Sequence, residues 1–131
     1  MKNQILLLAS AAIFICCSTA DKTHITFSGN IKNNKEKVLK VSNYNSTLKK
    51  EIPIDSLGNF SGSVLVQKDG YGFFQVGRSY TTARFKKEKD VSVSIDADDF
   101  FRSLEYSGDL KKENNYNVAK SQLRSKLVGD A

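Results

Sequence analysis

The sequence predicts an all-β fold, an antiparallel β-sandwich of about seven or eight strands followed by a C-terminal α-helix. Apolar and polar residues alternate through residues 25–108, with the period of two typical of strands that have one buried face. Turn residues interrupt the alternation roughly every ten residues. Near the C-terminus the apolar period becomes helical. A chain of 131 residues allows one domain with a modest core.

The expected strands follow one another along the chain. They lie at residues 25–31, 38–41, 48–54, 60–66, 71–76, 80–85 and 91–95. Pro53 has no N–H to donate, so we expect its strand at a sheet edge. Gly58 supplies the positive φ that a tight hairpin at 55–59 needs. The strand at 71–76 is apolar on both sides, which favours a central position.

The pattern changes after Ile95. Residues 96–104 suit a short helix with acidic residues in its first turn, and residues 105–108 suit a return to the sheet edge. From about Glu113 to Val128 the period is helical. One stripe of this helix contains Tyr116, Ala119, Leu123 and Leu127, and the other faces carry Lys112, Arg124 and Lys126. We expect Tyr116, Leu123 and Leu127 to fold back on the sandwich, to contact a partner or second copy, or to be the remnant of a longer helix.

The N-terminus has the features of an export signal. Lys2 precedes an apolar run at residues 5–15, which is too short to span a bilayer comfortably. The run ends at Cys16 and Cys17 and resembles the lipobox of bacterial lipoproteins, which implies an acylated Cys. Cys17 follows a small residue and is the preferred lipid attachment site, with Cys16 as the alternative. A plain secretory signal cut near residues 18–20 and an uncleaved anchor are the other interpretations.

These boundaries define the expected domain organisation and cellular location. Residues 1–16 form the lipoprotein signal, 17–24 a tether, 25–108 the sandwich and 109–131 the C-terminal helix. The expected location is the cell envelope, with the protein anchored in the outer membrane through its acyl chains and facing the periplasm or the cell surface.

Several segments carry a resemblance when taken in order: residues 25–31, residues 54–60, Gly70-Tyr71, residues 91–96, residues 101–108 and Asn114-Asn115-Tyr116. Together they resemble the β-rich N-terminal accessory domain of envelope-anchored thioredoxin-like thiol:disulfide oxidoreductases. In that family the Asn-Asn-Tyr segment opens a helix that leads into a catalytic domain with a CxxC motif. This chain ends inside the corresponding helix, so the resemblance carries over no catalytic residue.

The sequence offers few groups for chemistry, and we predict no catalytic, cofactor-binding or metal-binding residue. Its two Cys are adjacent, which excludes an intramolecular CxxC pair, and His24 is the only His. The acidic residues Asp96, Asp98, Asp99 and Glu105 allow either a calcium site or, as we prefer, a solvated junction with a capping Asp.

The formal charge is +6, and most of the cations are Lys in loops or at strand ends. An exported protein with more Lys than Arg is not expected to bind nucleic acid. Weak, salt-sensitive attraction to anionic lipid headgroups or acidic glycans fits the charge better. The aromatic strand from Tyr71 to Phe74 offers a possible surface for a glycan or another small ligand.

The expected function is that of a non-catalytic envelope lipoprotein whose sandwich is an interaction or spacer module. Its partner would be a protein, such as a separate thioredoxin-like domain, or a second copy of the chain. Two alternatives stay open. One is a fragment or separate half of a thiol:disulfide oxidoreductase, and the other is a surface module that binds a glycan or small ligand.

Overall fold

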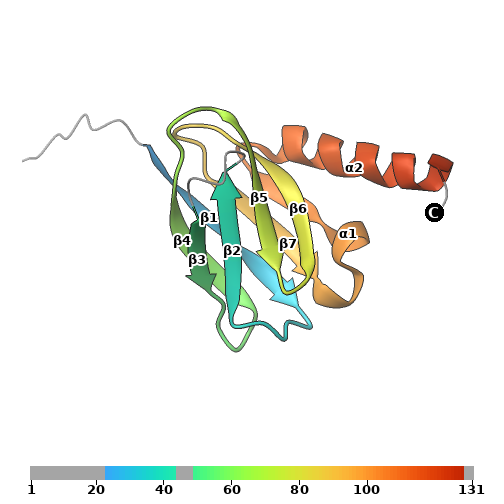
Figure 1. Cartoon of the computed structure of the whole chain (residues 1–131), viewed down its shortest axis with the longest axis horizontal. Helices are drawn as coiled ribbons and strands as arrows, with labels where there is room; N and C mark the ends of the chain where they lie inside the picture. Colours follow the sequence, from blue (N-terminus) through green and yellow to red (C-terminus); the bar gives the residue numbers. More distant parts are fainter. Residues whose placement is uncertain (1–22, 44–48, 129–131) are drawn as a thin grey trace, which may run out of the picture.

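The computed structural model describes residues 23–43 and 49–128, which form two four-stranded sheets packed face to face (Figure 1). One sheet has the strand order β4-β1-β7-β8 and the other has the order β3-β2-β5-β6. The strands are β1 (His24–Lys32), β2 (Val38–Asn43), β3 (Lys49–Pro53), β4 (Asn59–Leu65), β5 (Gly70–Val76), β6 (Ser79–Phe85), β7 (Val91–Asp96) and β8 (Glu105–Gly108). The predicted sandwich is confirmed.

Phe27 lies at the centre of the core. It is fully buried on β1, and its ring centroid lies 5.4 Å from that of Phe60, 5.3 Å from that of Phe74 and 5.8 Å from that of Phe85. These rings come from both sheets, so one aromatic cluster joins the two layers. The alternation predicted for β1 is confirmed, since Ile25 and Ile31 are buried with Phe27.

Two local predictions about the chain between β3 and β4 are confirmed. Pro53 lies on β3, which is an edge strand. Gly58 adopts a φ of 83° in the turn that follows. Only the bridge between Ile54 and Phe60 closes this turn, because β3 and β4 lie in different sheets and do not pair as the predicted hairpin. There the Asp55 carboxylate accepts hydrogen bonds from the backbone N–H groups of Leu57 and Asn59, at 2.9 and 2.8 Å. This Asp-closed turn fixes the direction in which the chain passes from one sheet to the other.

The direction of one strand pairing differs from expectation. β1 pairs with β7 in parallel, while the other pairings of the described strands are antiparallel. Alternation of apolar residues determines which face of a strand is buried, but it does not determine the direction of the neighbouring strand. β5 is central in its sheet as predicted, but only one of its faces is buried, because Tyr71 and Gln75 are exposed.

Short helices and one long helix follow β7. η1 (Ala97–Asp99) and α1 (Phe100–Ser103) occupy the predicted helical segment, and β8 then adds to the sheet edge as predicted. α2 (Lys111–Val128) begins beside the sandwich and extends beyond it (Figure 1). No helix in the described part of the chain is long and apolar enough to cross a membrane.

Candidate functional site

The first turn of α2 joins the edges of both sheets through two adjacent side chains, Asn114 and Asn115, which we call the Asn clip. Asn114 is 1% exposed. Its side-chain oxygen accepts from the backbone N–H of Arg84 at 2.8 Å, and its amide nitrogen donates to the Arg84 carbonyl at 3.3 Å. The side chain therefore pairs with β6 much as a neighbouring strand would.

Asn115 makes the equivalent pair of hydrogen bonds on β8. Its oxygen accepts from the backbone N–H of Tyr106 at 2.7 Å, and its nitrogen donates to the Tyr106 carbonyl at 2.9 Å. β6 and β8 are edge strands of different sheets. The Asn clip therefore satisfies the backbone groups of one residue on each of two sheet edges and fixes the start of α2 between them.

Tyr106 adds a second connection between the same two edges. Its side chain is almost completely buried, and its hydroxyl donates to the Thr82 carbonyl of β6 at 3.5 Å. Burial raises the pKa of the Tyr106 hydroxyl well above its ordinary range, so this group stays protonated and remains a donor.

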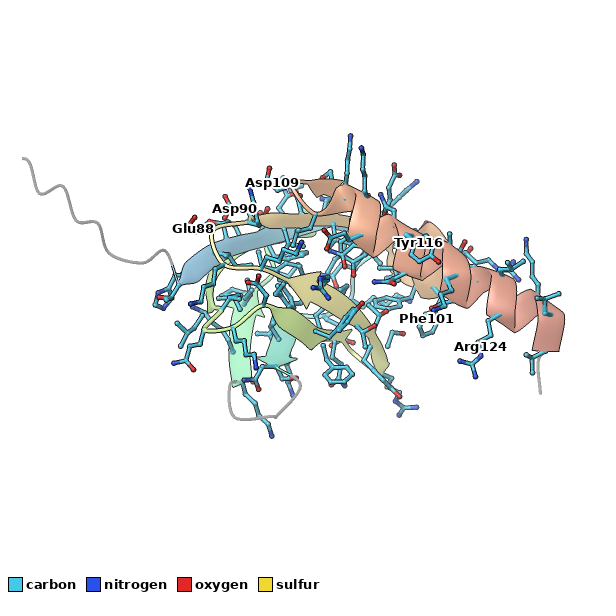
Figure 2. All side chains as sticks on the ribbon, turned by 90° about the horizontal axis from the view of Figure 1, so that it is seen from above. Glu88, Asp90, Phe101, Asp109, Tyr116 and Arg124 are labelled. Atoms are coloured by element: carbon cyan, nitrogen blue, oxygen red, sulfur yellow. The ribbon has the colours of Figure 1, made fainter. Side chains whose placement is uncertain are left out.

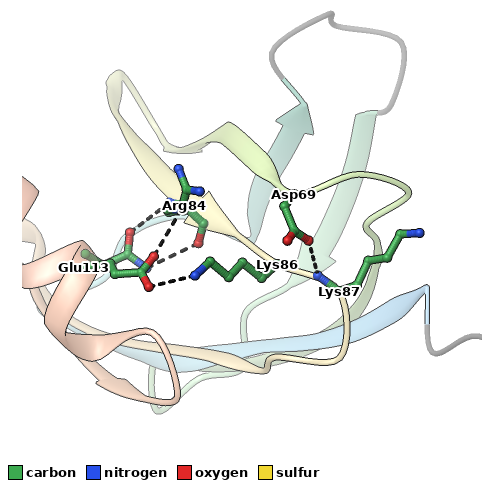
Figure 3. A network of polar contacts seen from close by, with 6 residues as sticks. Asp69, Arg84, Lys86, Lys87 and Glu113 are labelled. Carbon is green, nitrogen blue, oxygen red and sulfur yellow. Dashed lines mark hydrogen bonds and ion pairs between the residues drawn. The ribbon is translucent and has the colours of Figure 1, made fainter.

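An ion pair reinforces the attachment beside the Asn clip (Figure 3). The Glu113 carboxylate lies 3.1 Å from Arg84 Nε and 2.8 Å from Lys86 Nζ. The hydrogen bond from Lys86, followed by the charges of Lys86 and Arg84, lowers the pKa of Glu113 below its ordinary value. All three side chains are partly exposed, so solvent weakens the pair. It orients α2 more than it stabilises the fold.

The predicted stripe on α2 points into solvent. Tyr116, Leu123 and Leu127 are 67%, 58% and 78% exposed. Of the three alternatives for this stripe, folding back on the sandwich is therefore wrong. The inner side of the helix is held instead by Val118, which packs against the core, and by Gln122. The Gln122 amide donates to the Phe101 carbonyl of α1 at 3.1 Å.

The predicted stripe thus lies opposite to the face on which the helix rests. Polar groups of Asn114, Asn115 and Gln122 attach α2, whereas most of its large apolar side chains are exposed. A helix in a lone domain ordinarily shows the reverse arrangement. The apolar outer face of α2, which we define as Tyr116, Ala119, Leu123 and Leu127 and call the outward face, is the candidate functional site.

On α2 itself, the charged residues beside the outward face are basic. Between Asn114 and Val128 the sequence contains Lys120, Arg124 and Lys126 and no acidic residue. Figure 2 shows Tyr116 and Arg124 on α2, with Phe101 of α1 near the helix. Phe101 is itself 60% exposed and lines a groove of about 1080 Å³ between α2 and the α1–β6 region.

The acidic cluster has a structural role. The Asp96 carboxylate accepts from the backbone N–H of Asp98 at 3.0 Å and from the Asn33 amide at 2.9 Å, and so caps η1 as predicted. The Asn33 hydrogen bond, followed by that from Asp98, lowers the pKa of Asp96. Among the described residues no group of three His, Cys, Asp or Glu side chains is arranged to hold a metal ion.

The remaining predicted groups lie apart from the outward face. Tyr71 is 45% exposed, and the Arg84 guanidinium lies 5.3 Å from its ring centroid. Phe74 from the same strand is in the core, so the aromatic residues of β5 divide between the two faces of the sheet. His24 is exposed at the start of β1. Cys16 and Cys17 lie outside the described residues.

The Asn clip was not predicted from the sequence. In the sequence, Asn114-Asn115-Tyr116 contributes only to the resemblance described above. The available signal was two consecutive Asn in the first turns of a helix, since Asn is a poor helix former and its amide readily replaces a backbone partner.

No family model, curated protein or solved structure matches this chain. The resemblance to an oxidoreductase accessory domain therefore stays a prediction.

Proposed function

We propose that this chain is a non-catalytic lipoprotein of the cell envelope whose sandwich presents α2 to a protein partner. One observation carries the proposal, namely that α2 exposes Tyr116, Leu123 and Leu127 while polar contacts hold its other side. Contiguous exposed apolar side chains on an ordered element are typical of interaction surfaces. A spacer alone would not require them.

The mode of attachment supports the same proposal. The Asn clip and the hydrogen bond from Gln122 fix α2 at two places along its length. A surface that is held in one geometry before binding loses less conformational entropy when a partner arrives. The sandwich therefore acts as a rigid support for the helix.

The proposed address rests on the N-terminal sequence. Residues 17–24 can extend over at most about 26–29 Å, so acylation at Cys17 would hold the sandwich close to the bilayer. Metabolic labelling with palmitate tests this. We expect the label on the wild type and on Cys16→Ser, and no label on Cys17→Ser, which should move to the soluble fraction. Unchanged labelling and membrane retention of Cys17→Ser would refute anchoring at this residue.

The non-catalytic part of the proposal needs its own assay. The purified full chain is incubated with a disulfide substrate and a reductant, and a thioredoxin serves as the positive control. We expect no rate above the uncatalysed background. Multiple turnover would assign the chain to the oxidoreductase alternative.

A second candidate function is favoured by Tyr71. Its exposed ring borders a cleft of about 1010 Å³ that Lys50 and Glu51 also line, and exposed aromatic rings beside polar groups can stack on sugars. A glycan array tests this candidate. Binding that is lost in Tyr71→Ala and kept in Tyr116→Ala would support it, and an array without signal would dismiss it.

A further inference from the structure

We infer that the outward face of α2 binds an α-helix of a partner protein that carries acidic residues beside its own apolar stripe. The inference rests on the proposed interaction function and adds the chemistry of the partner. Spacing, charge and attachment of α2 each contribute to it.

The outward face has the spacing of a helix–helix seam. Tyr116, Ala119, Leu123 and Leu127 follow one another at intervals of three, four and four residues. This spacing keeps side chains on one narrow stripe, as at the contact positions of paired helices. The small Ala119 lies between two larger residues and leaves room for a side chain of the opposing helix.

The charges beside this seam determine which sign of charge the partner helix should carry. Lys120, Arg124 and Lys126 accompany the seam, and no acidic residue lies between Asn114 and Val128. The nearest acid on the helix, Glu113, is paired with Arg84 and Lys86 of the sandwich. Charges at the flanks of a helical seam select partners of opposite sign. An acidic helix is therefore complementary to α2.

The same charges disfavour a second copy of this chain. Two α2 helices packed through their outward faces would bring Lys120 and Arg124 of each copy close to cations of the other. Like charges beside a helical seam destabilise pairing. The observed composition therefore fits a heterologous partner.

A lipid surface fits the helix less well than a partner helix. Helices that lie in a bilayer interface need a broad apolar face opposite a charged one. Here the apolar seam is narrow, and the opposite side rests on the sandwich and on α1 through Val118 and Gln122. A partner helix needs only the seam that α2 provides.

Binding of two designed peptides to the full chain, purified in mild detergent, tests the inference. Both peptides are helical with Leu at the seam positions. One carries Glu at the flanking positions and the other carries Lys. Fluorescence anisotropy should give a Kd for the Glu peptide at least about tenfold lower than for the Lys peptide, with weaker binding at high salt. Equal affinities for the two peptides would overturn the inference.

Variants locate the binding to the outward face. Leu123→Ser combined with Leu127→Ser should raise the Kd of the Glu peptide at least about tenfold, because exposed seam leucines act as anchors. Their exposure means that the melting temperature should not change. The matched control is Leu57→Ser, which alters a similarly exposed leucine in the distant turn between β3 and β4 and should leave affinity unchanged. Unchanged affinity of the double variant would overturn the inference.

A charge exchange provides the sharpest test. Lys120→Glu combined with Arg124→Glu should reverse the preference so that the Lys peptide binds more tightly.

A concentration-dependent dimer of the wild type in sedimentation equilibrium would overturn the inference in favour of a second copy. Binding to vesicles with phosphatidylglycerol, without binding to either peptide, would overturn it in favour of a lipid surface.

These results separate the inference from the proposed function. If palmitate labelling depends on Cys17 but the Glu peptide does not bind, the proposed lipid anchor is supported and the inferred acidic partner helix is refuted. If the Glu peptide binds through Leu123 and Leu127 but no label is incorporated, the outward face is supported as a binding surface and the lipid anchor is refuted.

Discussion

Asn114 and Asn115 are neighbours in the chain but bind edge strands of two different sheets. Asn114 pairs with the Arg84 backbone of β6 and Asn115 with the Tyr106 backbone of β8. Successive helical residues point in directions about 100° apart, so two adjacent side chains can reach two separate strands. This relationship fixes how α2 leaves the sandwich.

Loss of either member of the Asn clip should destabilise the domain. Asn114→Ala leaves the partly buried Arg84 backbone groups without their partner and should lower the free energy of unfolding by about 1–3 kcal/mol. Asn115→Ala should lower the free energy of unfolding by a similar amount, because the Tyr106 backbone groups lose their partner. Urea unfolding measures both, and Asn117→Ala on the same helix should remain within about 0.5 kcal/mol of the wild type. Equal stability of all three variants would contradict the role of the clip.

Glu113 should make a small, pH-dependent contribution. Its pKa is lowered in the folded state by Lys86, so its stabilising effect is present above the ordinary Glu pKa and disappears as the pH falls through the folded pKa. The difference in unfolding free energy between the wild type and Glu113→Gln should therefore shrink between neutral pH and pH about 3. Urea unfolding at both pH values measures this. A difference that grows on acidification would contradict the assignment.

Val93→Asp should unfold the sandwich. Val93 is 2% exposed on β7, and a carboxylate there would be buried without a partner. We expect a loss of about 4 kcal/mol or more, measured by thermal unfolding. The matched control is Ser94→Asp, whose side chain is on the exposed face of the same strand. A melting curve of Val93→Asp close to that of the wild type would contradict the inward face of β7.

Gly29→Ala should be destabilising although Gly29 lies within a strand. A Cβ there would clash with the Val93 carbonyl oxygen of β7 and come within 2.9 Å of the Phe60 ring. Overpacking of this kind costs about 1–3 kcal/mol. Urea unfolding against the neighbouring control Ser28→Ala tests this. A more stable Gly29→Ala would show that β1 and β7 can separate without cost.

Much of the fold could be predicted because each strand has a clear local signal. The buried positions Phe27, Val93 and Ile95 follow from alternation, and the tight turn at Gly58 follows from turn chemistry. The parallel pairing of β1 with β7 could not be predicted in this way, because it joins distant segments whose pattern is the same for either direction.

The candidate site was predicted in part. The period of α2 identified Tyr116, Leu123 and Leu127 as one stripe, which the structure places on one exposed face. The same pattern gave no information about which side of the helix contacts the sandwich. That choice depends on Asn114, Asn115 and Gln122, whose partners are far away in sequence.

Local periodicity by itself determined the strands, the turns, the final helix and the members of its apolar stripe, because each depends on neighbouring residues. The tertiary structure alone decided that α2 attaches through amide side chains and turns its leucines to solvent. The reason is physical. The backbone groups of an edge strand must find hydrogen-bond partners, and they become neighbours of the helix only after both sheets have formed.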